Sequence, residues 1–424
     1  MSGSFEELGR AEDRQGAAHS PEAVTAPADR ERVARAALTY LAEPGDPWLV
    51  AVVRKHGAAR AVAAIQEGRF PGGSRVTGAA TRAMERWRLR LAEIPQSADL
   101  TRLAAQGCRL ICPADPLWPA GLADLADGEP YALWARGALT DLAALTRRSV
   151  AIVGSRAATA YGSYVAAEIA ASIAARGWTV ISGGAYGIDG SAHRGAMSAR
   201  GMTMAVLACG VDRPYPAGHK DLLDAIAATG AVISEWPPGR PAGRLRFLVR
   251  NRVIAAMASG TLVVEAGQRS GALNTARHAG DLGRPLMAVP GPVTSDLSAG
   301  CHAIIRDWGG TLVTSSDEVI ERLSAGSVTG AEAKAERRGP VPGDVPSATS
   351  PRNRRSQADW ARDALDLEAA TVLDALPARG AGLPTSDIAI RAGLAPNVVL
   401  AKLAMLRVYD LAERTDEGWR ASRG

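Results

Sequence analysis

Cysteine, lysine, aromatic side chains and long apolar runs are all scarce in this chain of 424 residues. No run reaches the ~18 apolar residues of a membrane helix, and the acidic first residues lack an apolar stretch, so we predict neither a membrane span nor a signal peptide. Four scattered cysteines are too few for a disulfide scaffold, and no histidine–cysteine cluster completes a zinc site around Cys108 and Cys112. We therefore expect a cytoplasmic protein that holds no metal and no cofactor.

The remaining composition is typical of a globular protein with several domains. Hydrophobic residues make up 47% of the chain but aromatic residues only 4%, so the cores must consist mainly of Ala, Val, Leu and Ile. The 45 glycines indicate many tight turns. A net charge of +5 fits a polyanionic partner without requiring one.

The two ends of the chain differ from its centre. Residues 1–30 lack a hydrophobic period and are predicted to be a disordered tail. Residues 31–100 have helical periodicity, with helices expected over 31–41, 47–65 and 79–91, and resemble sterile-alpha-motif or helix–hairpin–helix modules. Residues 324–365 are rich in Pro and Arg and are predicted to be a linker. In 366–424, helices expected over 370–376, 384–391 (capped by Thr385) and 397–406 precede a hairpin at 411–419, which predicts a winged-helix domain.

The central region, residues 101–323, starts with an approach segment (101–146) and continues with short apolar runs that alternate with helical segments. Seven such runs begin at positions 150, 179, 204, 231, 261, 286 and 311. They are continuously apolar, as strands are when helices cover both faces of a sheet. The pattern predicts an α/β fold with an extended, Rossmann-like, doubly wound parallel sheet.

Ligands of such sheets bind beyond the carboxyl ends of the strands, so the residues that follow each strand are the candidates for chemistry. Small residues, which let a backbone approach phosphate, follow three of the strands together with arginines. The candidate residues in these three loops are Gly154, Ser155, Arg156, Ser182, Gly183, Tyr186, Arg269, Ser270 and Gly271. We predict that they form a phosphate-binding rim.

A basic stretch without an acidic residue follows the fourth central strand. Its candidate residues are Arg244, Arg246, Phe247, Arg250, Asn251 and Arg252, preceded by Arg240. Arginines at the start of a helix are unfavourable unless an anion binds there. With a stacking ring among them, they are typical of a single-stranded nucleic-acid site. The alternatives are that Phe247 is a core residue and that the arginines form a solvated face.

Catalytic interpretations find less support. Neither a Gly-x-Gly-x-x-Gly loop nor a P-loop is present. Ser191 lies between Asp189 and His193, but an acid in the first turn of a helix and a packed histidine explain this group more simply. Glu265 could act as a general base, although we favour a role in orienting Arg269 or a backbone amide.

The ordered motifs of the central region resemble the DNA-processing protein A (DprA/Smf) family. They are Gly154-Ser155-Arg156, Ser182-Gly183 through Gly187-Ile188-Asp189, Tyr215-Pro216, Ser234-Glu235-Trp236-Pro237, Phe247 with Arg250-Asn251-Arg252, Glu265-Ala266 and Arg269-Ser270-Gly271. The chain departs from the family pattern at Tyr186 and Arg269, where the family usually has Arg and Lys. Tyr186 removes a charge and offers a stacking surface.

The resemblance implies a protein that binds and protects single-stranded DNA without sequence preference. It further implies loading of the RecA recombinase onto that DNA in natural transformation, a homodimer formed through the Rossmann-like domain, and no enzymatic activity. Arg156, Phe247, Arg250, Asn251, Arg252, Arg269 and Ser270 fall on positions at which the family contacts DNA.

Two other classes of function compete with this one. One is a nucleotide N-glycoside hydrolase of the lysine-decarboxylase-like Rossmann group, but the Pro-Gly-Gly loop of that group is missing before Thr261. The other is a transcription factor that reads duplex DNA with residues 397–407, of which only Lys402 and Arg407 are basic.

Overall fold

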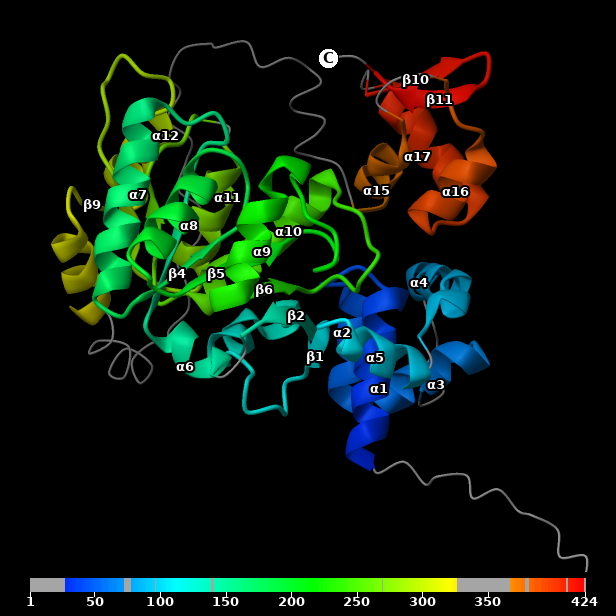
Figure 1. Cartoon of the computed structure of the whole chain (residues 1–424). Helices are drawn as coiled ribbons and strands as arrows, with labels where there is room; N and C mark the ends of the chain where they lie inside the picture. The colour runs from blue at the N-terminus through cyan, green and yellow to red at the C-terminus, as the bar shows by residue number, and fades with distance from the viewer. Residues whose placement is uncertain are drawn as a thin grey trace, which may run out of the picture.

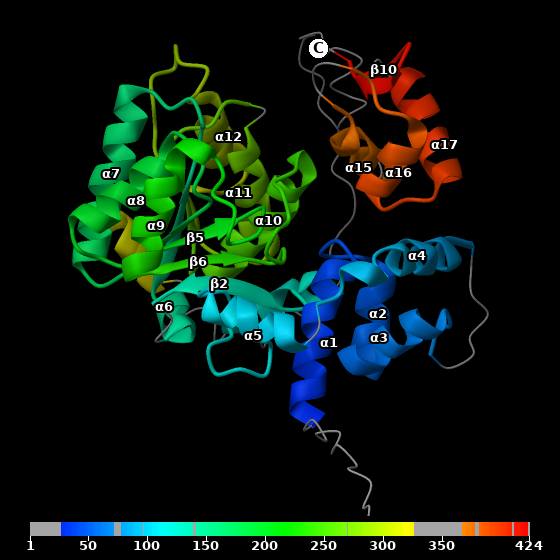
Figure 2. The ribbon, with the colours of Figure 1, turned by 45° about the vertical axis from the view of Figure 1, so that its right-hand side comes forward.

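The computed structural model describes residues 27–71, 78–95, 97–138, 141–268, 270–325, 367–377, 381–408 and 411–422. The predicted tail up to residue 26 and the predicted linker from residue 326 lie outside this part of the chain. Figures 1 and 2 show three bodies: a helical one in blue, an α/β one from cyan to yellow, and a small one in orange and red.

The helical body begins earlier than the sequence predicts. Its helices are α1 (Pro27–Leu41), α2 (Pro47–His56), α3 (Ala58–Glu67), α4 (Gly78–Leu89), the short η1 (Leu91–Glu93) and α5 (Ser97–Ala105). Asp46 caps α2 by accepting from the backbone N–H groups of Trp48 and Leu49. Leu38, Leu49, Ile65 and Trp87 are among the side chains that form its core. The sequence analysis missed α5.

The α/β body is built on a sheet of nine strands in the order β1-β2-β6-β5-β4-β3-β7-β8-β9. All seven predicted strands are present: β3 (Ser149–Val153), β4 (Thr179–Ser182), β5 (Thr203–Leu207), β6 (Ala231–Ser234), β7 (Thr261–Val263), β8 (Leu286–Ala288) and β9 (Thr311–Leu312). They pair in parallel. The sheet is nevertheless not purely parallel, because β1 (Arg109–Ile111) and β2 (Leu133–Gly137) from the approach segment extend it antiparallel beside β6.

Helices cover both faces of this sheet, which explains the continuously apolar strands. Side chains that alternate along β3 point to opposite faces: Ala151 and Val153 pack with α10 (Arg244–Met257), α11 (Gly271–Asp281) and α12 (Ala299–Asp307), whereas Val150 and Ile152 pack with α7 (Ala160–Ala175) and α8 (Ile188–Ser198). The remaining elements of this body are η2 (Ala120–Gly128), α6 (Leu142–Arg147), η3 (Ala217–His219), α9 (Lys220–Thr229) and the helical residues 316–325.

The C-terminal body consists of α15 (Leu367–Ala375), α16 (Thr385–Ala392), α17 (Pro396–Val408) and the antiparallel pair β10 (Ala412–Thr415) and β11 (Gly418–Ala421). This is the order of elements that the winged-helix prediction requires, and that assignment stays a prediction. Thr385 is the first residue of α16 and Pro384 precedes it without a side-chain cap, so the predicted cap is wrong. In both views α4 lies next to α16, and Arg90 donates to the carbonyl of Ala392 there.

Candidate nucleic-acid interface

The strand order reverses between β3 and β7, with β4, β5 and β6 on one side and β8 and β9 on the other, and a cavity lies at this switch point. After β3 the chain proceeds to α7 on one face, and after the neighbouring β7 it proceeds to α11 on the other, so the two loops diverge. The cavity has a volume of about 760 Å³, and its lining includes Gly154, Ser155, Arg156, Asp189, Tyr215, Phe247, Arg250, Asn251, Ser270 and Gly271. We call it the switch-point pocket.

The loop after β3 is fastened to the loop after β7. The backbone N–H of Ser155 donates to the carbonyl of Glu265 at 2.7 Å, and a Cβ on Gly154 would lie 2.8 Å from the same oxygen. The Glu265 carboxylate accepts from the backbone N–H and the hydroxyl of Thr159, the residue that caps α7. The predicted role of Glu265 in orienting a backbone amide is therefore confirmed, and its carboxylate is occupied in holding α7.

The loop after β4 is organised by Asp189. Its carboxylate lies in the first turn of α8, as predicted, and accepts from the N–H groups of Gly183 and Ala185. Burial raises its pKa, while Arg250 opposes that shift. Ser182 is fully buried and donates to the carbonyl of Ile152. The prediction that Ser182 and Gly183 contact the ligand is thus not supported, since they build the loop beneath the pocket.

The Ser191–His193 hypothesis also fails on geometry. The ring of His193 is fully buried, and its Nδ1 lies 2.7 Å from the hydroxyl of Thr203 on β5. Burial lowers its pKa to about 3, so it is neutral at physiological pH. His193 is the packed residue that the simpler interpretation predicted.

Phe247 is part of the pocket and not of a core. It lies between Tyr215, at 5.3 Å between ring centroids, and Arg156, whose guanidinium carbon is 4.6 Å from the centroid of the Phe247 ring. Its ring is only half-buried and belongs to none of the hydrophobic clusters among the described residues. The core-residue alternative for Phe247 is therefore wrong. Tyr215, which is 45% exposed, is a pocket residue that the sequence analysis quoted as a motif but left out of the site.

Arg250 and Asn251 form the floor of the pocket. Arg250 is only 4% exposed and donates to the carbonyls of Gly183 and Val206. Burial lowers its pKa to about 10, which still leaves it cationic at neutral pH. Asn251 accepts from Arg250 and donates to the carbonyl of Gly271 at the start of α11. Ser270 caps that helix.

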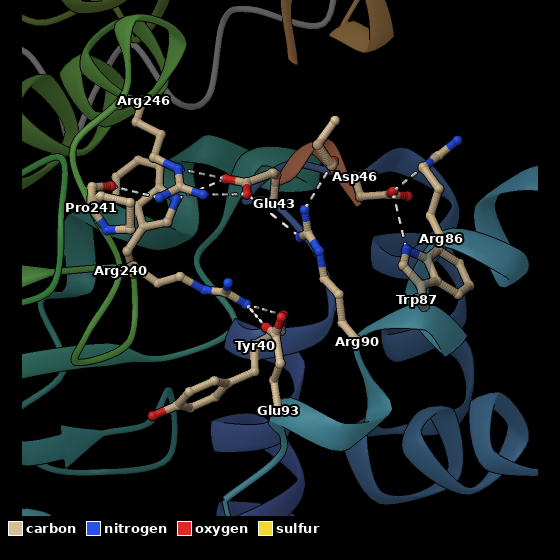
Figure 3. A network of polar contacts seen from close by, with 12 residues as sticks. Tyr40, Glu43, Asp46, Arg86, Trp87, Arg90, Glu93, Arg240, Pro241 and Arg246 are labelled. Atoms are coloured by element: carbon tan, nitrogen blue, oxygen red, sulfur yellow. Dashed lines mark hydrogen bonds and ion pairs between the residues drawn. The ribbon is translucent and has the colours of Figure 1, made fainter. Parts of the chain in front are cut away.

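The other arginines of the basic stretch face acids from distant segments. Arg252 pairs with buried Glu235 through two bonds of 2.6 Å, Arg246 pairs with Glu43 at 2.7 Å, and Arg240 pairs with Glu93. Figure 3 shows the last two pairs at the boundary with the helical body. The stretch contains no acid of its own, but acids from distant segments neutralise these three arginines, and they are largely buried, so the solvated-face alternative is wrong. The side chain of Arg244 and all of Arg269 lie outside the described part of the chain.

Arg156 differs from these three residues. It is exposed at the mouth of the pocket, and no carboxylate in the described part of the chain forms an ion pair with it. Tyr186 is 49% exposed and packs edge-on against His219, beside the pocket residue Ala185. Among the residues described, no group of three potential metal ligands occurs and no helix could cross a membrane. All four cysteines are buried and free.

A Rossmann-like sheet with a pocket at its switch point defines a doubly wound α/β protein, a class that holds its ligands beyond the carboxyl ends of the strands. Residues 109–324, about half of the chain, match the family model described as DNA recombination-mediator protein A. The chain belongs to this family, also named DprA or Smf, and has a DNA-processing role.

Similar proteins support this membership over nearly the whole length. The chain is 43% identical over 397 residues to the DNA processing protein DprA of Mycobacterium tuberculosis, which covers 91% of this chain and 93% of that one. It is 40% identical over 198 residues to the protein Smf of Escherichia coli, covering 46% and 52% of the two chains. The crystal structure of DprA from Streptococcus pneumoniae superposes with a TM-score of 0.56 at 28% identity, covering 69% of this chain and 97% of that one.

Proposed function

We propose that this protein binds single-stranded DNA in the switch-point pocket without sequence preference, and that it protects the strand and loads RecA onto it. The observation that carries the binding proposal is the exposed Arg156 guanidinium stacked on Phe247 at the mouth of the pocket. A cation for phosphate next to a ring for a base is what an unpaired strand requires. Family membership supports the recombinase step, a homodimer, a cytoplasmic location and a place in natural transformation.

The binding step requires no catalytic group. Asp189, Glu265 and His193 are each engaged in holding a loop or a helix. We infer that the pocket holds its ligand without breaking a bond in it. Incubation with nucleoside monophosphates should then release no free base, and release would favour the glycoside hydrolase.

The binding proposal is tested by charge reversal at the pocket mouth. Arg156→Glu should abolish binding of a fluorescent oligothymidylate, because it places an anion where a phosphate should lie. Arg109→Glu makes the same change in net charge on the edge strand β1, five places from β3 in the sheet, and should retain binding. Equal affinities of the two variants would remove the pocket from the proposal.

The loading step needs a separate assay. RecA filament assembly on an oligonucleotide should become faster when the wild-type protein is present, and Arg156→Glu should remove that acceleration. Acceleration that persists in Arg156→Glu would show that loading does not depend on this pocket.

A further inference from the structure

A second aromatic group lies beside the switch-point pocket. Tyr186 packs against His219 with 4.6 Å between ring centroids, and half of its surface remains exposed. The two residues come from different segments, the loop after β4 and the turn η3 that follows β5. Neither Tyr186 nor His219 is among the residues that line the switch-point pocket.

The backbone connects this group to the pocket on both sides. Ala185 lines the pocket directly before Tyr186, and a Cβ on Gly187 would collide with the carbonyl of Ser155. On the other side, Tyr215 lines the pocket and starts the short segment that ends at His219. Phe247 and Tyr215 therefore line the pocket, and Tyr186 adjoins it next to the lining residue Ala185.

The position of the Tyr186 ring is fixed by its neighbours. A Cβ on Gly218 would lie 2.5 Å from the Tyr186 hydroxyl oxygen, so the end of the ring lies close to the backbone of η3. His219 Nδ1 lies 3.0 Å from the carbonyl of Gly184, which can only accept, so this nitrogen carries the proton. The Tyr186 ring is thus held in place before a ligand arrives, which reduces the entropy lost on binding.

A cation accompanies the two rings. Arg194 on α8 is exposed, and its Nη2 lies 3.3 Å from Nε2 of His219. Because Nδ1 of His219 donates, Nε2 accepts this bond from Arg194. No ion pair joins Arg194 to a carboxylate within the described residues. Tyr186 and Arg194 thus combine an aromatic ring with a guanidinium that has no carboxylate partner among the described residues, as Phe247 and Arg156 do in the pocket.

We propose that Tyr186, supported by His219 and accompanied by Arg194, is a second base-stacking subsite that carries single-stranded nucleic acid from the switch-point pocket across η3. This inference rests on the proposed function, because the first subsite must hold the strand. Stacking on Tyr186 needs an unpaired base, so duplex DNA gains nothing from this subsite.

Affinity as a function of oligothymidylate length tests the inference in the full-length protein. The wild-type affinity should rise with length until both subsites are filled. Tyr186→Ala should leave the affinity for the shortest bound oligonucleotides unchanged and lower that for long ones about tenfold. Tyr164→Ala, a change at an exposed tyrosine on α7, should alter neither. An unchanged affinity of Tyr186→Ala for long strands would overturn the inference, whereas a wild-type protein that binds no strand would overturn the proposed function itself.

Two further variants separate stacking from charge. Tyr186→Phe should keep the wild-type affinity, because the ring remains. Tyr186→Arg should bind long strands with a salt dependence steeper by about 0.7, the value for one added phosphate contact. Loss of affinity in Tyr186→Phe would contradict stacking.

The guanidinium is tested against a matched charge. Arg194→Ala should lower the affinity for long strands and reduce the salt slope by about 0.7, whereas Arg109→Ala should leave both unchanged. Equal effects of the two substitutions would show that Arg194 contributes only to net charge.

Discussion

Two faces of the helix α10 both carry arginines, but one face lines the pocket and the other forms ion pairs within the protein. Phe247, Arg250 and Asn251 line the switch-point pocket, and we call this side the pocket face. Arg246 and Arg252 form ion pairs with Glu43 and Glu235, and we call this side the acid-paired face. A basic stretch that is uniform in sequence is therefore divided by the helix into one part for a ligand and one part for the protein itself.

The comparison shows that the charge available to a ligand depends on ion pairs with residues that are distant in the sequence. Glu43 lies in the helical body, more than 200 positions before Arg246, and Glu235 follows β6. Without these carboxylates the acid-paired face would leave two half-buried or buried cations uncompensated, which is costly. The number of arginines of the basic stretch that remain for a polyanion is therefore smaller than the sequence of that stretch suggests.

The largest effect is expected on the acid-paired face, from Arg252→Ala. This change strands the buried carboxylate of Glu235 and should lower the free energy of unfolding by ~3–5 kcal/mol, measured by urea denaturation. Replacing both Arg252 and Glu235 by Met should recover most of that loss, because apolar side chains of similar volume need no partner. A loss below ~1 kcal/mol in Arg252→Ala would show that the pair is not a structural one.

The next effect belongs to the pocket face and concerns binding. Phe247→Ala should weaken single-strand binding by ~1–3 kcal/mol if the ring stacks a base, measured by fluorescence anisotropy. Phe70 offers a control, because it packs edge-on against Trp87 in the helical body. Phe70→Ala should destabilise that body and leave the affinity for DNA unchanged. If Phe247→Ala lowers the free energy of unfolding but not the affinity for single-stranded DNA, then Phe247 has a structural role and the pocket face does not bind the ligand through it.

The same comparison explains which parts of the fold and the site were predictable. The parallel strands β3 to β8 were visible because burial on both faces makes them largely apolar. The edge strand β1 and its neighbour β2 were missed because Arg109 and Arg136 interrupt their apolar character. Gly154, Ser155 and Ser270 line the pocket, as their positions after strands indicated, and their binding role stays a prediction. The local sequence does not predict that Glu43 and Glu235 pair with arginines, or that the Ser182 hydroxyl is buried, because these features depend on tertiary contacts.

A pH titration isolates the contact between the helical body and α10. Burial alone would raise the pKa of Glu43, but Arg246 and Arg90 lower it from 4.5 to about 2. The contribution of Glu43 to stability, on the order of 1 kcal/mol for a partly exposed pair, is thus fully present above pH 4.5 and is lost as the pH falls to about 2. The stability difference between the wild type and Glu43→Gln should follow this course. A difference that does not change with pH would show that Glu43 acts by packing and not by charge.

The smallest effect compares a single charge at the mouth of the switch-point pocket with a single charge on the acid-paired face. Arg156→Gln should reduce the slope of log affinity against log salt by ~0.7, because one phosphate contact and its released counterion are lost. Arg246→Gln makes the same change in net charge, but its guanidinium is neutralised by Glu43 before DNA arrives. The slope of Arg246→Gln should therefore equal that of the wild type, and a reduction in both variants would mean that DNA displaces Glu43 and reaches across α10 to the acid-paired face.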